Sequence, residues 1–217
     1  NRPIFRSSGS VEFDDYQKAL NATRLISQSG LYPANCRLLD ANEALFNGAG
    51  DGSKHLLILS FESADHELGT WLDRALEIAS SAGGSYEKPQ EKEPEAHRTG
   101  ASGTWRNSFI RAPFNRDAAV RRGIIWDTFE TSITWDHGFE FIESLKEKTR
   151  KAIHEISGRE PNVTCRLTHT YPDGCAPYFS YTAYATPSTM LDVWKQIKIA
   201  TNEMVVAEGA GAETERK

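Results

Sequence analysis

The sequence predicts an α+β protein: an antiparallel sheet built from two β-α-β-β-α (ferredoxin-like) units, with helices on one face. Two observations lead to this fold class. The order strand–helix–strand–strand–helix occurs twice, over residues 10–82 and 124–206, although the residues themselves do not repeat. The second unit also contains a clear hairpin, because the turn Tyr171-Pro172-Asp173-Gly174 joins two β-rich runs.

The first half of the chain contains strands and helices in alternation. Asp14 or Asp15 can cap a helix that ends at Gly30. Apolar residues at helical spacing predict a second long helix, from about Ala64 to Ser81. The other expected elements are strands over Ser10–Phe13, Cys36–Asp40 and His55–Phe61, and a short helix around Ala41–Phe46.

Residues 86–103 separate the two halves, 10–85 and 104–208. Charged residues, Pro and Gly dominate this segment, so we expect a mobile loop. The second half is expected to contain a short helix over Arg116–Arg122 that Asn115 can cap. A strand over Ile124–Ile133, a long helix after Asp136, the hairpin, and a last helix opened by Pro187-Ser188 follow it. Gly209–Lys217 is small, polar and charged, which predicts a disordered tail after a domain spanning 1–208.

Bulk properties narrow the classes of function. The chain has 217 residues, 39% of them hydrophobic and 25% charged, as in an ordinary globular protein. A net charge of −5 argues against nucleic acid as the main partner, and no apolar run reaches the length of a membrane span. We expect a domain cut from a longer protein, because the first residue is Asn and no signal peptide follows.

The three cysteines bear on the cellular compartment of the protein rather than on a metal site or a disulfide. Cys36, Cys165 and Cys175 form no CxxC spacing, so neither a zinc site nor a disulfide framework is expected. A reducing compartment, the cytoplasm, is therefore predicted.

The hairpin carries an unusually polar strand face. Residues two apart on a strand share a face, so Arg166 lies with Thr168 and Thr170, while His169 lies on the other side. On the second strand, Tyr178 shares a face with two further hydroxyl side chains, those of Ser180 and Thr182. Two interpretations stay open for this face: an ordinary solvated surface, or a surface that binds a ligand.

Three groups of residues, in order along the chain, carry a resemblance to a known family. They are Trp105-Arg106, Phe109–Phe114 and Arg116-Asp117; then Asp127–Ser132 and Trp135-Asp136; then Cys165-Arg166, Thr170-Tyr171, Gly174 and Tyr178-Phe179. With these motifs the chain resembles the alkyldihydroxyacetonephosphate synthases and their bacterial FAD-linked oxidase relatives, in the vanillyl-alcohol-oxidase flavoprotein superfamily. The resemblance is specific over residues 104–208 and looser over 1–85.

The resemblance implies a two-part flavoenzyme. An N-terminal domain binds most of the FAD, and a C-terminal cap with an antiparallel sheet covers the flavin ring and supplies the substrate pocket. This chain is similar to the cap alone, since it has no strand–GxGxxG–helix fingerprint. The expected substrate is a small phosphorylated or carboxylated hydroxy compound, and the expected partner is the FAD-binding domain.

Two residues carry roles over from the family. Arg116, in Asn115-Arg116-Asp117, aligns with the substrate-binding arginine, and a guanidinium fork suits a phosphate or carboxylate. Tyr178 aligns with the catalytic tyrosine, which moves a proton on the substrate beside the flavin. Taken without the resemblance, Arg116 fits a surface arginine near a helix start, and Tyr178 fits a sheet tyrosine with its hydroxyl in water.

Arg166 and His169 are further candidates for substrate contacts. They belong on opposite faces of a regular strand, so they reach the same ligand only if the strand bulges. Arg166 has the stronger claim because it shares its face with two threonines. His169 is more often, by its pattern, a packed or surface histidine.

One departure from the family bears on activity. The family has consecutive histidines shortly after the last helix, whereas Glu208-Gly209-Ala210 is followed here by Gly211–Lys217 without a histidine. We therefore expect the fragment alone to be inactive.

A second hypothesis comes from a different class of protein. The chain is then a non-catalytic α+β module that binds a ligand or forms a homodimer through its open sheet face. It predicts that Arg116 and Tyr178 lie far apart. The enzyme hypothesis predicts that both point into one concave region on the open face.

Overall fold

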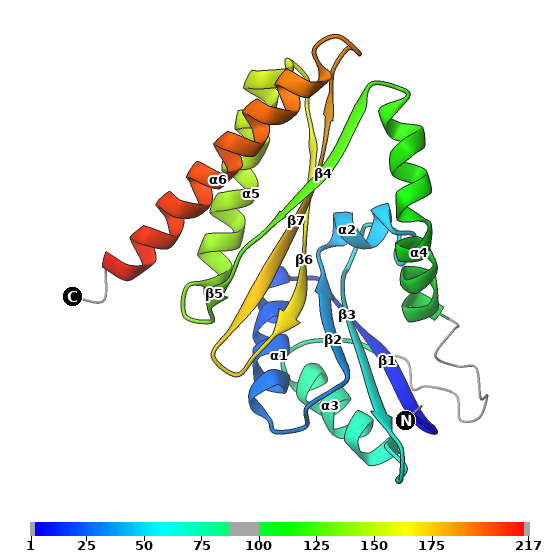
Figure 1. Cartoon of the computed structure of the whole chain (residues 1–217). Helices are drawn as coiled ribbons and strands as arrows, with labels where there is room; N and C mark the ends of the chain where they lie inside the picture. Colours follow the sequence, from blue (N-terminus) through cyan, green and yellow to red (C-terminus); the bar gives the residue numbers. More distant parts are fainter. Residues whose placement is uncertain (1–2, 87–99, 215–217) are drawn as a thin grey trace. The chain divides into compact units, whose positions relative to one another are not determined.

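The computed structural model describes residues 3–86 and 100–214. The strands are β1 (Phe5–Phe13), β2 (Asn35–Leu39), β3 (His55–Ser63), β4 (Ile124–Glu130), β5 (Ile133–Thr134), β6 (Asn162–Thr170) and β7 (Gly174–Tyr184). The helices are α1 (Tyr16–Gln28), α2 (Ala41–Phe46), α3 (Gly69–Ser81), α4 (Gly100–Val120), α5 (Gly138–Ser157) and α6 (Met190–Thr214). Figure 1 labels these elements on the ribbon.

The predicted fold class is confirmed. The strands form one seven-stranded antiparallel sheet in the order β1-β3-β2-β6-β7-β4, with β5 paired to β7. The order strand–helix–strand–strand–helix is present twice, and α2, α4 and β5 are added to it. By their contacts, the residues group into two compact units: unit 1 is Asn1–Ile110 with Arg166–Cys175, and unit 2 is Arg111–Cys165 with Ala176–Lys217.

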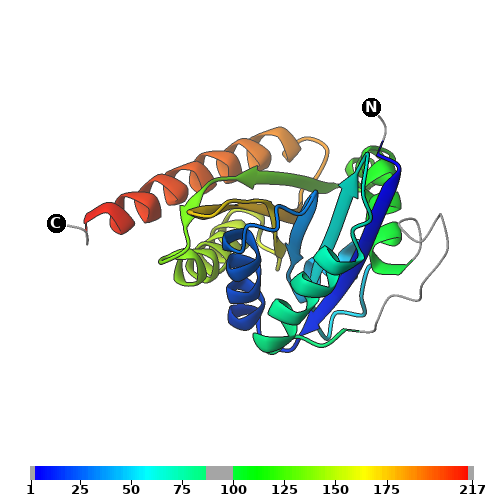
Figure 2. The ribbon, with the colours of Figure 1, turned by 90° about the horizontal axis from the view of Figure 1, so that it is seen from below.

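Unit 1 is built on β3, which pairs with β1 and β2. The register runs from Phe5 opposite Ser63 to Phe13 opposite His55, without interruption. Gly9 lies on the face that meets α3, since a Cβ at this position would lie 3.4 Å from the Leu76 side chain. Figure 2 shows α1 and α3 beside these strands, where they cover the face that carries Leu57 and other fully buried residues.

The short helix α2 covers part of the opposite face of unit 1. Ala44 packs with Leu39, Leu56 and Ile58, and all four side chains are buried. Because Leu56 and Leu57 are neighbours on β3, their side chains project to opposite faces. The helices α1 and α3 therefore share one face of the strands of unit 1, as predicted, whereas α2 packs on the opposite face.

Unit 2 places α5 and α6 side by side on one face of β4 and β7 (Figure 1). The strands pair from Ile124 opposite Tyr184 to Glu130 opposite Tyr178. On the covered face, Phe129 stacks on Phe179 with ring centres 4.8 Å apart. Burial of these rings with the apolar stripe of α5 stabilises the unit.

Most element boundaries agree with the sequence. Asp15 caps α1 by accepting a hydrogen bond from the Lys18 amide at 2.8 Å, and Gly30 takes a positive φ of 76° after the helix ends. In the hairpin, the Tyr171 amide donates to the Gly174 carbonyl at 2.8 Å, as the turn signal predicts.

Several other boundaries differ. β1 begins at Phe5 rather than Ser10, α3 begins at Gly69 rather than about Ala64, and β4 ends at Glu130.

The largest differences concern two helices that lack a clear amphipathic pattern. The prediction of a short helix over Arg116–Arg122, capped by Asn115, is wrong: α4 runs from Gly100 to Val120, through Pro113. The end of the expected mobile loop, 100–103, thus has helical backbone, while 87–99 lies outside the described residues. Similarly, α6 continues to Thr214, into the segment expected to be a tail.

No helix within residues 3–86 and 100–214 is long and apolar enough to cross a membrane. The same residues contain no group of three His, Cys, Asp or Glu side chains that could hold a metal ion. All three cysteines are buried thiols, and burial raises the pKa of Cys36 to about 11 and that of Cys175 to about 12.

Candidate functional site

Strand β4 presents different chemistry on its two faces in unit 2. Ile125, Asp127 and Phe129 are buried, whereas Trp126 and Thr128 are half-buried. This alternation follows from the pleat of the strand, since successive side chains project to opposite faces. Asp127 thus lies on the face covered by helices, and Thr128 lies on the other.

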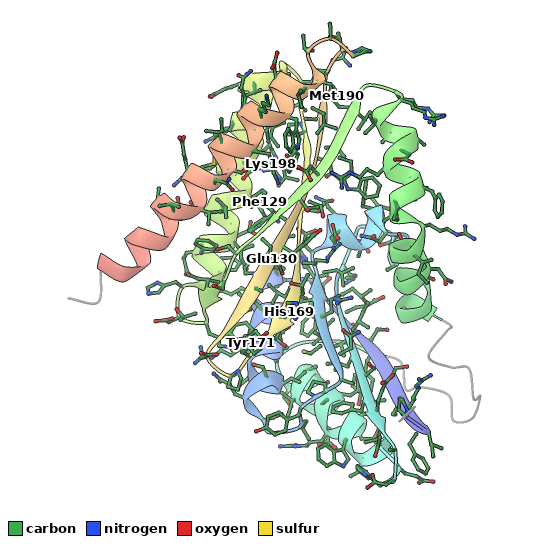
Figure 3. The ribbon with its side chains drawn as sticks, viewed as in Figure 1. Phe129, Glu130, His169, Tyr171, Met190 and Lys198 are labelled. Atoms are coloured by element: carbon green, nitrogen blue, oxygen red, sulfur yellow. The ribbon has the colours of Figure 1, made fainter. Side chains whose placement is uncertain are left out.

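Asp127 is surrounded by hydrogen-bond donors. Its Oδ2 accepts a hydrogen bond from Trp194 Nε1 at 2.7 Å and lies 3.2 Å from Lys198 Nζ. The Tyr181 hydroxyl lies 3.5 Å from the same oxygen. Lys198 also donates to the Thr128 carbonyl at 2.7 Å, so it joins α6 to β4 (Figure 3).

These contacts shift the pKa values of Asp127 and Tyr181. Burial alone would raise the pKa of Asp127, but hydrogen bonds from Trp194 and the Thr128 amide and the charge of Lys198 lower it below its ordinary value. Burial raises the pKa of Tyr181, and the nearby Asp127 charge raises it further. At neutral pH, Asp127 is therefore a carboxylate and Tyr181 a phenol that can donate to it.

Arg116, the predicted substrate-binding arginine, is paired with this carboxylate. Its Nη2 lies 3.1 Å from Asp127 Oδ1, and 54% of its side chain is exposed. A half-exposed guanidinium in a single ion pair has only a modest attraction to its partner. An anion arriving from solution can compete for it.

Tyr178, the predicted catalytic tyrosine, makes its contact on the other side of β4. Its hydroxyl donates to Thr128 Oγ1 at 3.0 Å, and its ring is half-buried. Ser180 and Thr182 follow it at two-residue spacing on β7, opposite Thr128 and Trp126. The polar face expected from the sequence is present on these strands.

Arg116 and Tyr178 therefore contact adjacent residues of β4 whose side chains project to opposite faces. Arg116 reaches Asp127, and Tyr178 reaches Thr128. The enzyme hypothesis predicts that both side chains point into one concave region, and this stays a prediction.

In unit 1, Arg166 forms a buried ion pair. Its Nη1 donates to Glu43 Oε1 at 2.6 Å, and the two side chains are 12% and 1% exposed. Arg166 is opposite Leu39 in the pairing of β2 with β6, and Leu39 packs against α2. The arginine therefore lies on the face of unit 1 that carries α2.

A second arginine of unit 1 lies near the first. Arg37 is half-buried on β2, where burial lowers its pKa to about 10 and the positive charge of Arg166 adds to this effect. With this pKa, Arg37 remains charged at neutral pH, and the Glu43 side chain is buried beside Arg166.

Arg37 also lines a pocket of about 460 Å³ within unit 1. The pocket lies where β2 begins and the hairpin turns, and Thr168, His169, Thr170 and Tyr171 line it as well. It combines one cation with hydroxyl groups and an imidazole, which is a donor set suited to an oxygen-rich anion.

His169 is the predicted site residue that lines this pocket. Its side chain is exposed, and its ring centre lies 6.4 Å from that of Tyr171, near the end of the hairpin (Figure 3). Arg166, Thr168 and Thr170 are all half-buried, while Leu167 between them is fully buried. The predicted alternation of faces along β6 is therefore present.

Sequence reasoning missed the acidic partners of both arginines. Glu43 follows Asp40 at the spacing of a helix-capping pair, which hides any other role. Asp127 lies in a motif that the resemblance uses, but nothing local marks it as buried. Arg37 lacks a signal too, because a single arginine in a short strand is common on surfaces.

Known proteins were compared with this chain and its structure. The family model described as FAD linked oxidases, C-terminal domain, matches residues 2–213. An alkyldihydroxyacetonephosphate synthase of Caenorhabditis elegans is 22% identical over 95% of this chain and 38% of its own length. A Trypanosoma brucei brucei protein of the same name is 24% identical over 48% of this chain and 17% of its own length.

Solved structures show the same fold. An alkyldihydroxyacetonephosphate synthase structure superposes with a TM-score of 0.75 and 15% identity, over 96% of this chain and 40% of that one. The 4-ethylphenol oxidase from Gulosibacter chungangensis gives a TM-score of 0.60 and 11% identity, over 97% and 45%. The chain spans about two fifths of these relatives' length. Since the family model covers nearly all of the chain, the protein belongs to the FAD-linked oxidases as their C-terminal domain.

Proposed function

We propose that this chain is the substrate-binding cap of an FAD-dependent oxidoreductase or of an alkylglycerone-phosphate-synthase-like flavoenzyme. The observation that carries the proposal is the family match over residues 2–213. The substrate is a small hydroxy compound with a phosphate or carboxylate group. FAD is bound mainly by an N-terminal domain outside this chain, which is its partner, and the chain alone is inactive.

The donor sets of the two units fit this role. The flavin ring and an anionic substrate both offer oxygen atoms that accept hydrogen bonds, and the described residues supply donors in Arg116, Arg166, Tyr178 and Thr128. When bound, FAD supplies the electron acceptor. The residues of this chain bind and orient the substrate and move its protons.

Each predicted residue receives a distinct task. Arg116, half-exposed at Asp127, takes the anionic group of the substrate as it arrives. Arg166, held in unit 1 by Glu43, is a further substrate-binding arginine. Tyr178 holds a proton that its hydroxyl exchanges with the substrate, and Thr128 Oγ1 fixes the direction of that hydroxyl. His169 lines the pocket beside Arg37 and offers a further hydrogen bond.

The proposal also covers the localisation of the protein and its oligomeric state. The buried thiols fit a reducing compartment, so we place the protein in the cytoplasm. A homodimer through the polar sheet face is part of the proposal only for the alternative function below.

The experiment starts from the flavoprotein that contains this domain, and from its absorbance spectrum. Anaerobic addition of D-lactate or glycolate bleaches the flavin if the protein is an oxidase or dehydrogenase. A spectral change with acyl-dihydroxyacetone phosphate alone, without consumption of an oxidant, identifies a synthase. A protein without a flavin band overturns the proposal.

Tyr178→Phe tests the proton-transfer role within the same experiment. We expect the rate of the flavin change to fall about 10²- to 10⁴-fold, as for other general acids and bases. Tyr184→Phe is the matched control, because Tyr184 is an exposed tyrosine of the same strand whose ring lies near Arg159. Equal rates in the two variants would remove Tyr178 from the mechanism.

A second function is favoured by one observation. Because the contacts of Arg116 and Tyr178 lie on opposite faces of β4, the chain also fits a non-catalytic module that binds a ligand or dimerises. That function predicts binding without a flavin. Sedimentation of the 217-residue chain over a range of concentrations separates a dimer from a monomer.

A further inference from the structure

Glu43 reaches its position through the start of α2. The Asp40 side chain caps the helix and accepts a hydrogen bond from the Glu43 amide at 2.7 Å. The Asn47 side chain donates to the Glu43 carbonyl at 2.9 Å. The backbone of Glu43 is thus fixed at both its amide and its carbonyl, and its side chain is 1% exposed.

Glutamate in this position usually has a local task. Three residues after a capping residue, a glutamate commonly accepts a hydrogen bond from the backbone amide of that capping residue. Here the carboxylate oxygen Oε1 accepts a hydrogen bond from Arg166, 123 positions further along the chain. The contact joins α2 to β6 within unit 1, so the helix holds the arginine of another strand.

The charges around this pair explain what the contact achieves. Arg166 is near Arg37, whose pKa its charge lowers, so the two guanidinium groups repel each other. The Glu43 carboxylate attracts Arg166 at 2.6 Å and fixes it against this repulsion. A guanidinium has five N–H donors in one plane, and the Oε1 contact uses one of them. The contact therefore restricts where the guanidinium lies and the directions in which its other N–H groups can point.

We propose that Glu43 is a positioning residue that orients the Arg166 guanidinium toward an oxyanion. This inference rests on the proposed function, in which Arg166 contacts an anionic group. Glu43 does not touch that anion. It acts only through the direction it gives to Arg166.

The test uses the 217-residue chain and inorganic phosphate as the probe. Affinity is measured by titration, with the arginine side-chain Nε–Hε signals followed by NMR. Simple electrostatics predicts that Glu43→Gln, which removes a negative charge beside two arginines, binds phosphate more tightly. Positioning predicts the opposite: we expect Glu43→Gln to bind phosphate about tenfold more weakly.

Two further variants make the test specific. Glu77→Gln is the matched control, since it removes the same charge from an exposed ion pair with Arg74 in the same unit, and it should leave the affinity unchanged. Glu43→Asp keeps the charge but shortens the side chain by one methylene. It should also weaken binding, and it replaces Glu43→Gln as the test if the latter does not fold by circular dichroism.

The outcomes separate the inference from the proposed function. If Arg166→Gln leaves phosphate binding unchanged, or if the chain binds no phosphate, the role of Arg166 fails and the inference fails with it. If Arg166→Gln abolishes binding while Glu43→Gln and Glu43→Asp bind as tightly as the unaltered chain or more tightly, only the inference is overturned. In an Arg166→Lys background, the effect of Glu43→Gln should disappear, because an ammonium is a point charge without a plane to orient.

Discussion

Each unit contains an arginine held by a carboxylate, and the two pairs differ in exposure. In unit 1, the side chains of Glu43 and Arg166 are 1% and 12% exposed. In unit 2, those of Asp127 and Arg116 are 12% and 54% exposed. The chemistry is the same, but only the second arginine has most of its surface in water. The first pair is suited to hold a fixed geometry, and the second to exchange its partner.

The surroundings of the carboxylates reinforce this difference. Asp127 keeps Trp194 and Lys198 as partners if Arg116 leaves. Glu43 is almost fully buried, so loss of its arginine would leave a carboxylate shielded from water. Departure of the arginine is therefore tolerable in unit 2 and costly in unit 1.

The largest effect should come from breaking the buried pair. We expect Glu43→Ala to lower the free energy of unfolding by about 3–5 kcal/mol, because it leaves Arg166 buried beside Arg37 without its counter-charge. Urea unfolding at pH 7, followed by circular dichroism, measures the change. A loss below about 1 kcal/mol, the range of exposed pairs, would remove the distinction between the two units.

An apolar replacement of the same pair gives the control. Replacing both partners, as Glu43→Leu with Arg166→Met, should recover most of the lost stability, since apolar groups of similar volume often substitute for a buried ion pair. If the double variant is as unstable as Glu43→Ala, the loss comes from packing against α2 rather than from charge.

An intermediate, pH-dependent effect is expected at Asp127. Its pKa is lowered in the folded protein, so its stabilising contribution is complete above the ordinary value near pH 4 and is lost as pH falls through the folded value. Asp127→Asn should cost about 1–3 kcal/mol at pH 7. The difference from the unaltered chain should shrink in urea unfolding series taken from pH 5 to pH 2. A constant difference across that range would show that Asp127 is not held as a carboxylate.

The smallest effect belongs to Arg116. Arg116→Ala should change the free energy of unfolding by less than about 1 kcal/mol, because the pair is half-exposed and Asp127 keeps its other donors. Thermal unfolding of the two proteins, at low and high salt, measures this. A loss as large as that of Glu43→Ala would mean that Arg116 is a structural residue, and would argue against its release to a substrate.

Most of the fold could be predicted from the sequence, because the residues that mark its helices and turns are local signals. Asp15 and Gly30 mark the ends of α1, and the turn at Tyr171–Gly174 fixes the hairpin. The extent of α4 could not be predicted. The helix α4 lacks an apolar face of helical period, which is the signal that predicts a helix, and it contains Pro113, a residue that usually ends one.

Only part of the candidate site could be predicted from the sequence, and the reason is physical. Arg116, Arg166 and Tyr178 lie in motifs that a resemblance can carry. Their partners depend on contacts between distant residues, such as Glu43 with Arg166, and no local pattern encodes these. Whether a carboxylate is buried beside an arginine is decided by packing, which spacing along the chain does not reveal.

The end of α3 has a consequence for how the chain behaves at high concentration. A first strand such as β1 has one open edge that invites other chains to pair with it. Here the Glu12 amide donates to Ser85 and the Ser85 amide to Glu12, at 2.8 and 2.9 Å, which closes that edge at one end. The closure depends on Gly84, where a Cβ would come within 2.4 Å of Val11. A side chain at Gly84 would therefore displace Ser85 and reopen this end of the edge to pairing with another chain.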